Sequence, residues 1–297
     1  MPPPNRTFSL DWLRLALASQ VVGLHIVGLH PFVVVYPVGA FVCISGYLIP
    51  DSFARSRGWP HFAWKRALRV MPVFLLSLAL VAVVEPSKLW LTVLAYLTMN
   101  VMGAGNANNA LWSLMAEEIL YATHALTRPW YGRALAWTGL AISMVGLWLT
   151  VRYSYLPVVS GCFFAGNLIA LHPGWRRVGV VWIAAVLLAV AGVQTRLAMH
   201  EEIGTIGRLG LPIIGATALL MLTLRIRLPE LRADYSYSLY ALHLPVLHLF
   251  PGSRLRMAIA AVTVLPVVCA LVWRFVEVPA LRLKDWRPFS PERPKPT

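Results

Sequence analysis

The first residues with the chemistry of a catalytic site are an arginine and a histidine in an apolar segment near the start of the chain. Arg14 and His25 lie eleven positions apart within residues 8–29. On an α-helix this spacing makes three turns plus about 20°, so both side chains share one face, about 16 Å apart along the axis. Ionisable groups in such segments usually face a cavity or another polar group. The pair therefore indicates a cationic site and a general base along one groove. The alternatives are an interfacial anchor for Arg14 and a hydrogen-bonded structural histidine for His25.

Two carboxylates interrupt the apolar segment at residues 111–127. Glu117 and Tyr121 are four positions apart and share one face of a helix. One hypothesis is that Glu117 orients a catalytic group or binds a substrate hydroxyl. The other is that the segment lies in the membrane interface, where Glu117 and Glu118 are both solvated.

Basic residues open a third apolar segment. Arg66 and Arg69 are three positions apart, which fits a clamp for the phosphates of a cytoplasmic ligand. Ordinary anchoring by positive charge on the cytoplasmic side explains the same pattern. Near the end of the chain, Arg274 and Glu277 are also three apart, and this spacing predicts a structural ion pair.

Smaller polar residues accompany these charges. Ser45 precedes Gly46 in the second apolar segment, where glycine permits close approach of a backbone or a ligand. Tyr240 and His243 lie in a segment rich in serine and tyrosine. They could line a groove that binds hydroxyl groups, or they could make hydrogen bonds between helices.

Metal and nucleotide motifs are missing from the sequence. His25 and His30, like His243 and His248, are five apart, so they diverge by about 140° on a helix, whereas helical zinc pairs are three or four apart. There is no phosphate-binding loop, dinucleotide fingerprint or nucleophile elbow. The cysteines have no CxxC spacing, and we expect them to be small buried side chains: Cys43, Cys162 and Cys269. We therefore expect no metal.

The composition indicates a membrane protein. Of the 297 residues 58% are hydrophobic and 13% are charged, about half the usual charged fraction of a soluble protein. This excludes a disordered chain and argues against an ordinary soluble enzyme. The net charge of +14 would suggest nucleic acid in a soluble protein. Here it fits the lysines and arginines of cytoplasmic loops, so we expect a lipid bilayer and no nucleic acid as partner.

Charge counting predicts the topology of the eleven apolar segments. If residues 86–127 cross the bilayer once, 20 basic residues lie inside and 6 outside; if they cross twice, the split is 12 to 14. The first solution obeys the positive-inside rule. It predicts an all-α bundle of about ten transmembrane helices with both termini cytoplasmic, and one of the segments 88–102 and 111–127 re-entrant or interfacial. Residues 1–283 form the membrane domain in this interpretation, followed by a polar, Pro-rich cytoplasmic tail at 284–297.

Six segments, taken in order along the chain, resemble the membrane acyltransferase-3 family. The first is the R-X10-H pattern of Arg14 and His25, and the others follow from the second apolar segment to the last: 44–49, 65–72, 111–121, 237–245 and 275–279. The resemblance implies transfer of an acyl group, commonly acetyl from acetyl-CoA, to a hydroxyl of a carbohydrate or glycoconjugate. It also implies about ten helices and a bacterial inner-membrane location.

This resemblance gives the candidate residues their roles as hypotheses. The proposed catalytic groups are His25, Arg14 and Glu117. Acyl-CoA, a donor substrate and not a bound cofactor, is assigned to Arg14, Arg66 and Arg69. The residues that bind the acceptor or support the catalytic groups are Ser45, Tyr121, Tyr240 and His243. The competing class is a polytopic transporter or flippase for a glycan or lipid-linked sugar, although no paired broken helices in matching halves support it.

Overall fold

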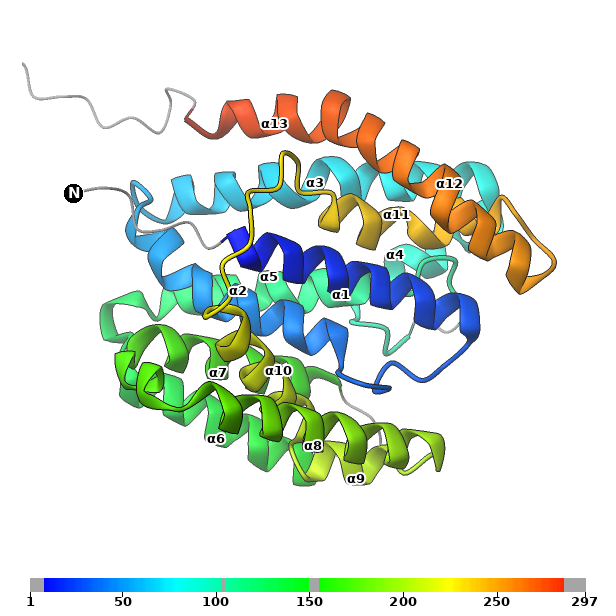
Figure 1. The fold of residues 1–297 in the computed structure, drawn as a ribbon. Helices are drawn as coiled ribbons and strands as arrows, with labels where there is room; N and C mark the ends of the chain where they lie inside the picture. Colours follow the sequence, from blue (N-terminus) through cyan, green and yellow to red (C-terminus); the bar gives the residue numbers. More distant parts are fainter. Residues whose placement is uncertain (1–7, 103–104, 150–154, 286–297) are drawn as a thin grey trace, which may run out of the picture. The chain divides into compact units, whose positions relative to one another are not determined.

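The computed structural model describes residues 8–102, 105–149 and 155–285, and this part of the chain is helical with no strand (Figure 1). The predicted Pro-rich tail lies outside the described residues from position 286 onward, as does Arg152, one of the arginines in the charge count. The helices belong to two compact units.

The first unit comprises residues 1–50 and 115–236. Within it α6 packs on α7, and α10 packs on both α7 and α8 (Figure 1). Its helices are α1 (Phe8–Val27), most of α2 (Pro37–Ala54), most of α5 (Trp112–Leu126), η2 (Arg128–Trp130), α6 (Arg133–Leu149), α7 (Tyr155–Leu171), η3 (Pro173–Arg177), α8 (Val180–Met199), α9 (Ile203–Arg208) and α10 (Leu211–Thr223).

The second unit comprises residues 51–114 and 237–297. The long helix α3 packs against α4 and α13, and α12 continues through a π-helical turn, η4, into α13. Its elements are α3 (Trp59–Val84), η1 (Pro86–Lys88), α4 (Leu89–Leu97), α11 (Ser236–His248), α12 (Arg254–Val272), η4 (Trp273–Glu277), α13 (Val278–Arg282) and η5 (Leu283–Asp285).

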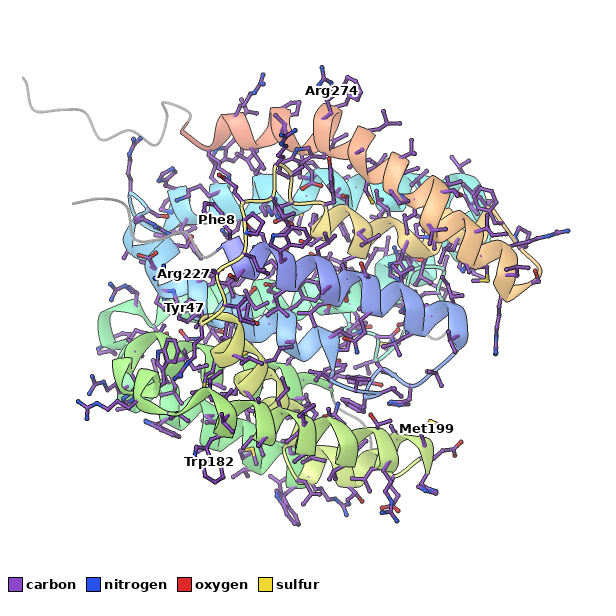
Figure 2. The ribbon with its side chains drawn as sticks, in the orientation of Figure 1. Phe8, Tyr47, Trp182, Met199, Arg227 and Arg274 are labelled. Atoms are coloured by element: carbon purple, nitrogen blue, oxygen red, sulfur yellow. The ribbon has the colours of Figure 1, made fainter. Side chains whose placement is uncertain are left out.

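The helices confirm an all-α membrane protein. Five helical segments of the described chain are long and apolar enough to cross a bilayer: 8–27, 37–54, 59–84, 180–199 and 254–282. Three apolar helices, α6, α7 and α10, are shorter. Trp182 projects outward from α8 with 74% of its surface exposed (Figure 2), as expected for a side chain that contacts lipid. The total of ten spans and the orientation of the termini stay predictions.

Helix length distinguishes the segments 88–102 and 111–127, of which the sequence predicts that only one crosses the bilayer. The nine residues of α4 rise only about 14 Å, less than half of a hydrocarbon core of about 30 Å. The irregular backbone that follows α4 includes Asn108, which is fully buried and donates to Ser77 Oγ and to the Ala241 carbonyl, both at 2.8 Å. Non-helical backbone at membrane depth requires such internal partners. We therefore infer that α4 is the segment that does not cross.

Two glycines allow α2 and α7 to touch through their backbones. A Cβ on Gly46 would lie 2.0 Å from the Phe163 carbonyl oxygen, and one on Gly166 would lie 2.0 Å from that of Cys43. No side chain fits at either position, because the obstructing atoms are backbone atoms. The sequence left Gly46 open between helix packing and approach of a ligand, and the structure shows helix packing.

Gly46→Ala should destabilise the protein. Overpacking of a well-packed contact typically costs about 1–3 kcal/mol, and here the backbones of two helices must separate to admit the methyl group. We expect a lower apparent Tm and less monodisperse protein in detergent. Gly23→Ala is the matched control, because nothing lies within 4 Å of a Cβ at that helical position. Equal thermal stability of the two variants would contradict the close α2–α7 contact.

Candidate active site

Helix α1 carries both residues of the arginine–histidine pattern, as the sequence predicts. Arg14 and His25 lie within one uninterrupted helix, Phe8–Val27, and therefore near one face of it. The Arg14 side chain is 22% exposed and the His25 residue is exposed. The arginine side chain is thus largely buried, whereas the histidine is exposed.

The hydrogen bonding of His25 fixes its neutral tautomer. Nδ1 lies 2.8 Å from the Val21 carbonyl oxygen. Since a carbonyl oxygen only accepts, Nδ1 carries the hydrogen of the neutral ring, and the lone pair is on Nε2. This is the arrangement a general base requires, because one nitrogen orients the ring and the other takes the proton.

An aspartate that is not among the predicted site residues lies beside Arg14. Asp234 Oδ2 is 3.9 Å from Arg14 Nη1, and Asp234 Oδ1 accepts from the backbone N–H of Ser236, the first residue of α11. Trp12 Nε1 donates to the Pro229 carbonyl at 2.9 Å, which ties the α10–α11 connection to the same end of α1. The ion pair therefore orients the guanidinium. The sequence signal that could have indicated Asp234 is its position just before the start of a helix, where aspartate typically caps the helix.

The structure brings together three predicted residues around one carboxylate. Glu117 Oε1 accepts hydrogen bonds from Ser45 Oγ and Tyr121 Oη. Tyr121 Oη also lies 3.1 Å from Ser45 Oγ. Ser45 and Tyr121 are buried and Glu117 is half-buried. This Glu117 cluster favours a positioned carboxylate over an acid solvated in the membrane interface.

In the second unit, the two arginines of the predicted phosphate clamp have different surroundings. Arg69 Nη1 lies 3.5 Å from Glu277 Oε2, and Glu277 is only 2% exposed. The spacing predicts Arg274 as the partner of Glu277, whereas the structure pairs it with Arg69. The reason is that Glu277 ends the π-helical turn η4, which packs on α3.

Arg66 lies one turn of α3 from Phe62, and its guanidinium carbon is 5.9 Å from the centre of that ring. The same end of α3 is fixed to η5. His61 Nε2 donates to the Lys284 carbonyl at 3.0 Å, and Trp64 Nε1 donates to the Leu283 carbonyl at 2.9 Å. These contacts preorganise the basic end of α3.

Tyr240 and His243 are buried within the second unit. Tyr240 Oη donates to the Ala110 carbonyl at 2.9 Å and lies 2.7 Å from Ser113 Oγ. His243 Nδ1 lies 2.8 Å from the Tyr240 carbonyl. Of the two hypotheses, the contacts of Tyr240 favour hydrogen bonding that holds α11 to residues 110–113 at the start of α5. The bond of His243 lies within α11.

Comparison with known proteins identifies the class. A protein with apolar helices long enough to cross a bilayer matches the acyltransferase domain of the acyltransferase-3 family over residues 7–276. The chain belongs to this family and is a membrane acyltransferase. It is similar to nodulation protein 10 of Rhizobium leguminosarum bv. viciae, with 26% identity over 93% of this chain and 94% of the relative. No solved structure matches it.

Proposed function

We propose that the protein transfers an acyl group, typically acetyl, from acyl-CoA to a hydroxyl of a carbohydrate or glycoconjugate in the bacterial inner membrane. The observation that carries this proposal is His25, whose Nδ1 is bonded to the Val21 carbonyl so that Nε2 can accept a proton. The family match over residues 7–276 supports the transferase class. The similarity to a bacterial nodulation protein supports the bacterial location.

The chemistry follows from the groups of the first unit. Nε2 of His25 takes the proton of the acceptor hydroxyl as its oxygen attacks the carbonyl carbon of the thioester. The new C–O bond forms, the C–S bond breaks, and the imidazolium returns the proton to the sulfur, which leaves as the CoA thiol. Arg14, held by Asp234, lies about 16 Å along the helix axis from His25 and therefore holds the donor at a distance from the reacting carbonyl. Glu117, held by two hydroxyls, orients a reacting group.

The donor's phosphates are assigned to the basic end of α3. Arg66 and Arg69 present guanidinium groups, which bind phosphate through paired N–H donors. The fixed position of this helix end, through Trp64 and His61, supports the assignment because preorganised donors lose less entropy on binding.

The proposal is tested with labelled donor. Membranes containing the protein are incubated with acetyl-CoA labelled in the acetyl group, and lipids and glycans are then extracted and separated. We expect label on a carbohydrate-containing fraction and stoichiometric release of CoA thiol, both missing with membranes that lack the protein. A transporter or flippase, the class that composition left open, gives neither, so failure to release CoA would overturn the proposal.

A further inference from the structure

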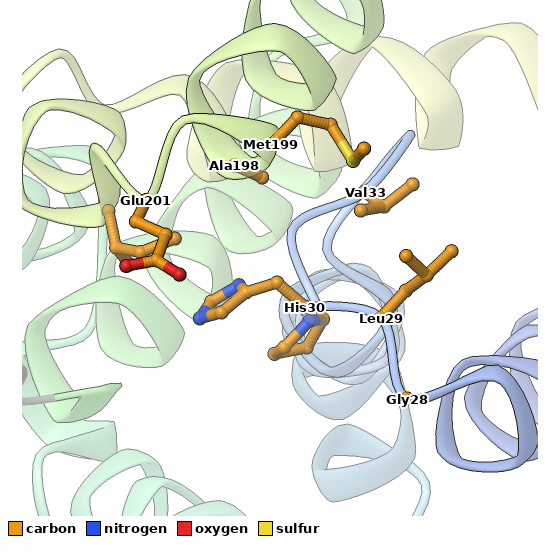
Figure 3. Close-up of a pocket in the computed structure, with 9 residues that line it drawn as sticks. Gly28, Leu29, His30, Val33, Ala198, Met199 and Glu201 are labelled. Atoms are coloured by element: carbon orange, nitrogen blue, oxygen red, sulfur yellow. The ribbon is translucent and has the colours of Figure 1, made fainter.

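A pocket lies beyond the C-terminal end of α1, between the α1–α2 connection and the end of α8. Its volume is about 660 Å³, within the range of sites for small organic ligands. Gly28, Leu29 and His30 form one wall, and Met199 and Glu201 form another (Figure 3). All of these residues belong to the first unit. We name this cavity the α1–α8 pocket.

The wall from the α1–α2 connection is held rigidly. Gln20 Nε2 on α1 donates to the carbonyl of Val35 at 2.8 Å. From α8, Gln194 Nε2 donates to the Phe32 carbonyl at 2.9 Å, and Thr195 Oγ1 accepts from the backbone N–H of Val34 at 2.8 Å. Side chains from two helices therefore fix this connection before any ligand arrives, which reduces the entropy cost of binding.

The polar groups of the pocket suit a neutral molecule rich in hydroxyls. The backbone N–H of Phe32 donates to His30 Nδ1 at 3.3 Å, so the neutral ring carries its hydrogen on Nε2 and donates from there. Burial lowers the pKa of the His30 imidazole below its ordinary value, which favours this neutral form. Glu201 supplies carboxylate oxygens that accept from hydroxyls. In the view of Figure 3 the His30 ring and the Glu201 carboxylate point toward each other.

The remaining residues that line the pocket suit the apolar face of a sugar ring. Pro31, Val33 and Ile203 are apolar, and the C–H face of a pyranose ring packs on such side chains. An anionic ligand is disfavoured by the Glu201 carboxylate. Glu201 also has a left-handed backbone, with φ of 59°. Such strain in a non-glycine residue concentrates at ligand-binding positions.

The pocket begins close to the candidate base along α1. Gly28 is three residues beyond His25, and its N–H bonds to the Leu24 carbonyl as the last turn of α1 closes. The pocket wall therefore begins about 5 Å along the helix axis from His25. In the topology predicted from charge, Arg14 lies toward the cytoplasm and this end of α1 faces the opposite side.

We propose that the α1–α8 pocket binds one sugar unit of the acceptor and presents its hydroxyl toward His25, an inference that rests on the proposed function. The three native cysteines are buried, so a maleimide reacts selectively with a cysteine introduced in place of the exposed Met199. Met199→Cys is reacted, in intact cells, with a bulky maleimide that does not cross membranes. Leu209→Cys is the matched control, because Leu209 is also exposed and does not line the pocket.

Three measurements follow on the labelled proteins: maleimide incorporation, binding of labelled acetyl-CoA, and transfer of acetyl to glycan. We expect both variants to react with the maleimide from outside the cell. The bulky group attached at position 199 should lower acetyl transfer at least tenfold and leave acetyl-CoA binding unchanged. Methyl glycosides of glucose, galactose and N-acetylglucosamine should slow labelling at position 199 but not at position 209. Because the protein is folded before it is labelled, a loss of transfer does not reflect misfolding.

Failure of the pocket assignment and failure of the proposed function give different results. Transfer by labelled Met199→Cys equal to that of labelled Leu209→Cys would overturn the pocket assignment. Labelling at position 199 that no glycoside slows would overturn its assignment to a sugar. If unlabelled Met199→Cys and wild type both fail to move acetyl from CoA to any glycan, the proposed function itself is wrong.

Discussion

His25→Ala should lower the rate of acyl transfer by about 10²–10⁴, the usual contribution of a general base, while the Kd for acetyl-CoA stays unchanged. The expectation rests on the ring orientation, since the Val21 carbonyl holds Nδ1 and the lone pair is on Nε2. A histidine that serves only packing would give a much smaller effect, because substitutions at exposed positions usually change stability little. The measurement is kcat/KM for labelled acetyl transfer in reconstituted vesicles.

Two controls separate catalysis from structure. His172→Ala removes a half-buried histidine of the same unit that has no role in the mechanism, and we expect its activity within about twofold of wild type. Added imidazole should restore part of the activity of His25→Ala, because the vacated site is accessible and imidazole supplies the same proton acceptor. Near-full transfer by His25→Ala would remove the base assignment, and a low rate that imidazole leaves unchanged would point to a structural role.

The sequence could predict those features that depend on spacing within one helix. Arg14 and His25 share α1 because eleven residues return nearly to the same face. Glu117 and Tyr121 meet because they are four apart on α5. Their contact with Ser45 from α2 was not predicted, since no local rule brings residues 72 positions apart together. The resemblance only placed the three among the candidate site residues.

Features set by tertiary packing could not be predicted in this way. The pairing of Glu277 with Arg69 depends on which helix η4 packs against, and a spacing of three also allowed Arg274. Asp234 reaches Arg14 through an irregular connection whose path has no periodicity. The α1–α8 pocket is formed by two helix ends, so its shape depends on helix lengths, and sequence patterns give helix boundaries least reliably.

Arg69→Ala should strongly destabilise the protein, apart from any effect on donor binding. The Glu277 carboxylate is only 2% exposed and lies 3.5 Å from the Arg69 guanidinium. Removing one partner of a buried ion pair leaves an uncompensated charge and typically costs about 3–5 kcal/mol. We therefore expect a large fall in apparent Tm and in the yield of folded protein, measured by thermal unfolding and gel filtration in detergent.

Replacing the acid as well should restore folding. In Arg69→Ala/Glu277→Gln the buried carboxylate charge is removed together with its partner, so we expect the apparent Tm to recover by more than half of the loss. Arg69→Ala with wild-type stability, or a double variant no more stable than the single one, would contradict the ion pair as a stabilising contact.

The rescued double variant then isolates the role of Arg69 toward the donor. If its guanidinium binds a CoA phosphate, the KM for acetyl-CoA stays raised about tenfold after folding is restored, the usual value of one charge-assisted hydrogen bond. Arg66→Ala is the comparison, because Arg66 lies over the Phe62 ring and its loss should raise the same KM with a smaller effect on stability. A rescued variant with wild-type KM would leave Arg69 as a partner of Glu277 alone, and the phosphate assignment would then rest on Arg66.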